Sequence, residues 1–184
     1  MRKRTFILIA ILSAVLFSTV VFPYSILSVY PTVSVKVDDM RQQTYNEDLV
    51  VFRTLFEEKA LQPDYVVSHS IALLLLYEMN WLTDANHHMK RIEWAQLLTN
   101  IQLVKSELIR LGFQEEGLSD EVKMYLEQMI DLTMQMEETV VYHVNKKATY
   151  SRKRIATTIR NLQNDMASSL NLYLHFWQAY YSGK

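Results

Sequence analysis

Eighteen consecutive residues without a charged side chain, Thr5 to Phe22, follow directly on the basic sequence MRKR. As a helix this run would be about 27 Å long, close to the roughly 30 Å of a bilayer's hydrocarbon core. The basic end of such a helix stays on the cytoplasmic side of the membrane. We therefore expect Thr5 to Phe22 to span the lipid bilayer once, with the rest of the chain on the far side.

The alternative is a cleaved signal peptide. Such a peptide has a shorter apolar stretch, of roughly 7–15 residues, and small residues at the cut site. Here Thr32 and Ser34 form the one tolerable pair, and cleavage near Ser34 would give a secreted protein. We expect an uncleaved anchor, so that 1–30 form the cytoplasmic tip and the span, 31–39 a linker, and 40–184 one extracytoplasmic domain.

Composition narrows the chemistry of that domain. Without the three cations of MRKR, 16 of the 19 basic residues remain against 20 acidic ones, a net charge of −4. This balance argues against nucleic-acid binding, which uses a basic face. The chain has no cysteine, which excludes disulfides, thiolate catalysis and cysteine-ligated zinc. Core packing alone must hold the domain together, and a bacterial cell envelope is its expected setting.

The chain has only three glycines and three prolines, too few for the many turns of an all-β domain. Apolar residues recur at alternating intervals of three and four along three long segments, which predicts helices packed at about 20°. The three stripes are Trp94, Leu97, Ile101, Val104, Leu108 and Leu111; Val122, Tyr125, Met129, Leu132, Met136 and Val140; and Ile155, Ile159, Leu162, Met166, Leu170, Leu174, Trp177 and Tyr181. We predict an all-α fold, with an N-terminal transmembrane helix followed by an antiparallel four- (or five-) helix bundle.

Other segments leave alternatives open. A first helix of the domain is predicted from Met40 to Leu61, whereas Tyr65–Leu111 forms either one helix or two joined by a break around Thr83–His87. The alternating segment Thr32–Val37 is interpreted as a linker or edge segment, because no partner strand is evident in the chain. Near the C-terminus, the side chains of Tyr173, Phe176 and Tyr180 either widen the buried stripe or form an exposed contact.

Histidines are the remaining candidates for metal chemistry. On a helix, Asp84 and His88 would share a face, with His87 beside them. The Glu-x-x-His motif of ferritin-like bundles is missing, as are the HExxH and Gly-rich motifs of common enzymes. We interpret these histidines as polar surface residues and expect neither a cofactor nor an enzymatic activity. A small metal-binding bundle that uses Asp84, His87 and His88 is the alternative.

Five cations surround the turn predicted before the last helix: Lys146, Lys147, Arg152, Lys153 and Arg154. At one tip of a bundle they would meet lipid headgroups, an anionic wall polymer or an acidic envelope protein. Cations are favourable near a helix C-terminus, which would account for Lys146 and Lys147. It would not account for Arg152, Lys153 and Arg154, which are predicted to lie at a helix N-terminus. We therefore expect a non-enzymatic, membrane-anchored interaction module, with self-assembly into a homo-oligomeric coiled coil as a further alternative.

Overall fold

A computed structural model describes residues 2–34, 39–61, 64–84, 86–114, 118–145 and 150–183. The described chain is mostly helical, as predicted. Its helices are α1 (Arg2–Val21), α2 (Asp39–Ala60), α3 (Tyr65–Tyr77), α4 (Asn80–Thr83), α5 (Glu93–Gln114), α6 (Asp120–Asn145) and α7 (Arg152–Ser182). Its strands are β1 (Thr32–Ser34) and β2 (His88–Lys90).

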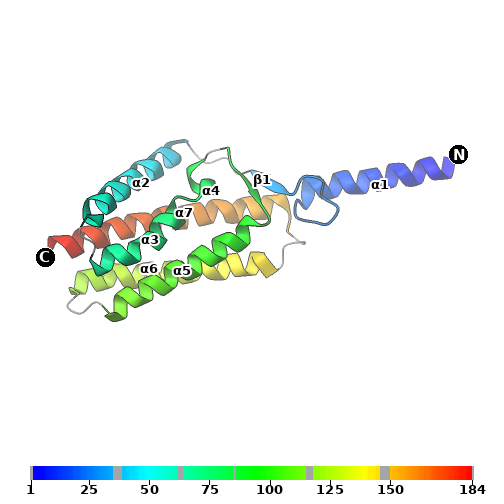
Figure 1. Ribbon diagram of the computed structural model, residues 1–184. Helices are drawn as coiled ribbons and strands as arrows, with labels where there is room; N and C mark the ends of the chain where they lie inside the picture. The colour runs from blue at the N-terminus through cyan, green and yellow to red at the C-terminus, as the bar shows by residue number, and fades with distance from the viewer. Residues whose placement is uncertain are drawn as a thin grey trace.

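Helix α1 projects away from the other helices, so that the N- and C-termini lie at opposite ends of the molecule (Figure 1). Its segment Lys3–Val21 is long and apolar enough to cross a membrane, and none of it is buried against the rest of the protein. The helix ends two residues before Pro23, which lacks a backbone donor and disfavours helix at the residue before it. The predicted N-terminal apolar helix is therefore present.

The remaining helices form one helical domain around a shared apolar core. Neighbouring helices in the pairs α3–α5, α5–α6 and α6–α7 pack closely, and α7 runs along the length of the domain (Figure 1). All six predicted stripe residues of α5 are buried, and Tyr173, Phe176 and Tyr180 widen the buried face of α7. The alternating spacing thus predicted the core-facing side of these helices.

The stripe of α6 is partly displaced from its predicted positions. Tyr125 and Leu132 are half-buried, and Leu126 and Thr133 are buried one residue further along. The ring of Tyr125 stacks on His175 of α7 with 5.8 Å between ring centroids, at the edge of the α6–α7 contact.

The segment Tyr65–Leu111 is neither one continuous helix nor two helices broken only at Thr83–His87. Helix α3 ends at Tyr77, and the chain then forms α4 and β2 before α5 begins. The side chains of Trp81 and Leu82, in the short helix α4, are buried in the core. Burial of these two large apolar side chains stabilises the interrupted conformation.

The prediction that the segment beginning at Thr32 has no partner strand was wrong. Strand β1 pairs antiparallel with β2, in a register that places Thr32 opposite Lys90 and Val33 opposite Met89. Val33 and Met89 both point into the core, as the period of two along a strand requires. The partner strand was missed because β2 lies inside the interruption between α3 and α5.

Candidate functional site

One candidate site lies where the end of α1 meets the helical domain; we call it the anchor junction. Its centre is Arg152, the first residue of α7. The guanidinium donates hydrogen bonds to the backbone carbonyls of Thr19 (3.0 Å), Val20 (3.1 Å) and Thr32 (2.9 Å). Carbonyls in the last turn of a helix lack partners within that helix. A single side chain therefore satisfies two of these carbonyls in α1 and connects α1, β1 and α7.

The charge of Arg152 suits this position. It stands at the N-terminus of α7, where a cation is unfavourable, but also at the C-terminus of α1, where the helix dipole is negative. From the sequence we predicted an external anionic partner for Arg152 and did not anticipate that its guanidinium binds backbone carbonyls of the same chain. No local sequence signal reveals the contact, because 132 positions separate Arg152 from Val20.

The chain beyond α1 also enters the domain through Tyr24, only 4% of which is exposed. Its hydroxyl donates to the Met89 carbonyl (3.0 Å) and accepts from the indole Nε1 of Trp94 (3.2 Å). Burial raises the pKa of Tyr24 to about 12, so the hydroxyl keeps its proton at neutral pH. The end of the apolar helix is thus tied to both β2 and α5.

A stack of rings supports the anchor junction from inside the domain. The imidazole of His143 stacks on Trp94 at 4.9 Å between centroids and lies 4.7 Å from the ring of Tyr150. The guanidinium of Arg154 lies 4.6 Å from the centre of the Tyr150 ring. Burial is the main reason why the pKa of His143 lies below its ordinary value, and the charge of Arg154 adds to the effect.

The outer surface of the anchor junction combines apolar and basic side chains. Next to the end of α1, the chain exposes Ile26, Leu27, Val29 and Tyr30. Exposed cations follow on the domain itself: Lys90, Arg91 and Lys153. Of the predicted basic tip, Lys146 and Lys147 lie outside the described residues.

A second candidate site is a cleft of about 520 Å³ between α2, α4 and α7. Its polar lining includes Arg41, Asp48, Arg160 and Asn164. Arg41 donates from Nη1 to Oδ1 of Asn164 (3.1 Å), which links α2 to α7 across the cleft. The cleft is formed by three separate segments of the chain, so no contiguous motif marks it in the sequence.

Comparisons with protein-family models, with curated proteins and with solved structures find no match to this chain. The two sites therefore have to be interpreted from their own geometry and chemistry.

The residues considered for a metal site make separate contacts. The Asp84 carboxylate accepts from the backbone amide of Asn86 (2.8 Å), His87 lies 2.7 Å from the Glu93 carboxylate, and His88 belongs to β2. Within the residues that the structure describes, no three His, Asp or Glu side chains are grouped so that they could hold a metal ion.

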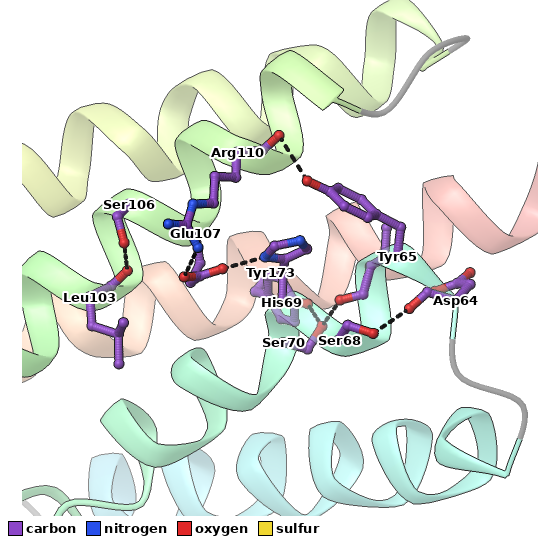
Figure 2. A network of polar contacts seen from close by, with 11 residues as sticks. Asp64, Tyr65, Ser68, His69, Ser70, Leu103, Ser106, Glu107, Arg110 and Tyr173 are labelled. Carbon is purple, nitrogen blue, oxygen red and sulfur yellow. Dashed lines mark hydrogen bonds and ion pairs between the residues drawn. The ribbon is translucent and has the colours of Figure 1, made fainter.

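At the end of the domain opposite α1, a polar network joins α3 to α5 and α7 (Figure 2). The His69 ring pairs with the Glu107 carboxylate, which also accepts from Arg110 (3.0 Å). Ser70 donates to the backbone carbonyl of Val66 (2.6 Å) and contacts the Tyr173 hydroxyl. Because the Ser70 hydroxyl is directed to Val66 and Tyr173, the arrangement differs from a Ser–His–carboxylate triad. We interpret the network as a connection between helices.

Proposed function

We propose that this protein is a membrane-anchored, extracytoplasmic binding module, an antiparallel helical bundle held at the bilayer surface without a catalytic role. The observation that carries the proposal is the set of three hydrogen bonds from Arg152. They join the last turn of α1 to the first turn of α7, so that the domain keeps a fixed position relative to the end of the span. An anchor with a free linker would leave the domain mobile.

The proposed orientation rests on the cations at the start of α1. MRKR precedes the apolar run, and cations of this kind remain in the cytoplasm. The domain would then lie outside the cell, with the anchor junction against the outer leaflet. Exposed Ile26, Val29 and Tyr30 would enter the interface between headgroups and hydrocarbon, where apolar and aromatic side chains are favoured.

Anionic lipid headgroups are the partner that this surface fits best. Lys90, Arg91 and Lys153 are exposed. Lys90 lies opposite Thr32 in the β1–β2 pair, and Lys153 follows Arg152, which binds the Thr32 carbonyl. Each cation near an anionic bilayer surface contributes about 1 kcal/mol of attraction. An envelope protein or a wall polymer would have to reach these cations past the membrane surface.

The orientation is testable because the chain contains no cysteine, so that a single introduced thiol gives a unique label. We expect Ser182→Cys to react with a membrane-impermeant maleimide in intact cells, and Lys3→Cys to react only after lysis. The reverse pattern would place the domain in the cytoplasm and refute the proposal.

The headgroup contact is tested by nitroxide labels on the full chain in anionic bilayers. A label at Ile26→Cys, where the native side chain is 96% exposed, should be shielded from a water-soluble relaxant. A label at Leu61→Cys, near the other end of α2, should be fully accessible to it. Lys153→Glu should move the label at residue 26 toward water. Lys123→Glu, in the first turn of α6, is the matched control and should leave it in place. Equal accessibility of both labels would contradict the contact.

A further inference from the structure

The cleft between α2, α4 and α7 has the size of a small-molecule site, since such sites usually enclose about 300–1,000 Å³. It opens beside α7 at residues 160–167. At about 1.5 Å per residue, these lie roughly 12–22 Å along the helix from Arg152. The cleft is therefore separate from the anchor junction.

The walls of the cleft are held in place by the side-chain amides of Gln42, which is buried, and Gln163, which is half-buried. The Gln42 side chain donates from Nε2 to the Leu82 carbonyl (2.5 Å), and Gln163 donates from Nε2 to the Trp81 carbonyl (3.2 Å). The two carbonyls belong to α4, which is thus fixed between α2 and α7. The Tyr45 hydroxyl donates to the backbone carbonyl of Tyr77 (2.8 Å), so its polar group is already engaged.

The interior of the cleft offers apolar contact. Tyr45, Leu82 and Ala167 line it, and Tyr45 and Leu82 are themselves part of the buried core. A bound molecule would therefore place a hydrophobic body against a tyrosine ring and aliphatic side chains. This composition, mainly apolar with a few convergent polar groups, is the usual one for small-molecule sites.

The polar lining has an excess of positive charge. Arg41 and Arg160 face the cleft from α2 and α7, against the single carboxylate of Asp48. The Arg41 side chain uses one donor on Asn164, and the Arg160 side chain makes no hydrogen bond or ion pair with the described residues. A guanidinium carries five N–H donors in a planar fork that matches carboxylate and phosphate oxygens. Both arginines therefore retain donors for an anion.

From this arrangement we infer that the cleft binds a small anion, a carboxylate or a phosphate, attached to an apolar body. The anionic group would lie between Arg41 and Arg160, and the apolar body against Tyr45 and Leu82. Asp48 opposes the binding of an anion. Burial, with a further contribution from the charge of Glu47, raises the pKa of Asp48, which reduces this opposition. The inference goes beyond the proposed function and does not depend on the orientation in the membrane.

Ligand-observed fluorine NMR on the full chain in nanodiscs tests the inference, with empty nanodiscs as the blank. The probes are fluorophenylacetate and fluorophenyl phosphate, with neutral fluorobenzyl alcohol for comparison. We expect both anions, or one of them, to bind at least about tenfold more tightly than the alcohol. The tighter-binding anion identifies the class of ligand.

Variants then assign the binding to the cleft. Arg41→Gln combined with Arg160→Gln should weaken anion binding at least about tenfold, whereas Arg110→Gln, the same change on α5, should not. Asp48→Asn should strengthen it, and this variant also serves if the double variant fails to fold. Equal binding of the anions and the alcohol would overturn the inference, as would unchanged binding by the double variant or weaker binding by Asp48→Asn. The labelling of Ser182→Cys is independent of each of these outcomes.

Discussion

Removing the donors of Arg152 should open the anchor junction without unfolding the domain. Arg152→Met keeps an aliphatic stem but loses the hydrogen bonds to Thr19, Val20 and Thr32. A hydrogen bond from a charged group contributes about 1.5–3 kcal/mol, and two of the three acceptors would become unsatisfied helix carbonyls. Because Arg152 is half-buried and water can replace part of its bonding, we expect a loss of about 3 kcal/mol rather than the full sum.

Hydrogen exchange on the full chain in nanodiscs measures this loss. The amides of Ser25, Val29 and Thr32 are hydrogen-bonded in the anchor junction and report its local opening. Their exchange should become about a hundredfold faster in Arg152→Met, since roughly 1.4 kcal/mol corresponds to a factor of ten. Amides in the middle of α5 should be unaffected.

The neighbouring residue provides the control. Arg154→Met removes the same charge two residues further along α7, but its guanidinium lies over the rings of Tyr142 and Tyr150 rather than on α1. It should change exchange at Ser25 and Thr32 by less than about fivefold, since an exposed cation–π contact contributes only about 0.5–1 kcal/mol. Equal exchange in Arg152→Met and the wild type, or equal effects of the two variants, would refute the role assigned to Arg152.

Three further predictions concern the helical domain. Asp64→Ala should lower the free energy of unfolding, measured by chemical denaturation, by about 1–2 kcal/mol. Asp64 accepts hydrogen bonds from the Val67 amide at the start of α3 and from the Tyr181 hydroxyl. An unchanged denaturation midpoint would contradict this role. Burial lowers the pKa of His143 below 6.5, so the folded protein binds this proton less readily than the unfolded chain. The contribution of neutral His143 to the free energy of unfolding should therefore be fully present above about pH 6.5, and it should be lost as the pH falls towards the lowered pKa. His143→Gln should lose that part of the pH dependence, and an identical pH profile in the variant would exclude His143 as its source. Gly112→Ala should raise the melting temperature, because alanine is favoured over glycine in a helix by up to about 1 kcal/mol. Among the described residues, the new Cβ would meet the end of the Leu126 side chain, at 3.3 Å. A lower melting temperature would show that Leu126 cannot move.

The parts of the fold that the sequence predicted are those set by local periodicity. In α5, the stripe from Trp94 to Leu111 is buried throughout, because a spacing of three and four places side chains on one side of a helix whatever its neighbours are. The apolar length of α1 likewise needs no tertiary information. The arrangement of the helices as a four-helix bundle depends on tertiary packing and stays a prediction.

The parts that sequence reasoning missed depend on contacts between distant segments. Trp81 continues the apolar phase of α3, so the interruption after Tyr77 is invisible to a periodicity test. Tyr24 resembles an interfacial aromatic residue next to a span, yet its partners Met89 and Trp94 bury it in the domain. Arg41 and Arg160 line the same cleft only because α2 packs on α7.

The anchor junction also bears on proteolytic maturation. A signal peptidase that cut near Ser34 would remove Tyr24 and Val33 from the core and take away every carbonyl that Arg152 binds. The released chain would expose Met89 and Trp94, which these residues now cover, and would leave a cation without its acceptors. Secretion would thus release a less stable protein than the one retained in the membrane. In this molecule the chain that directly follows the apolar helix α1 is thus also a structural component of the helical core.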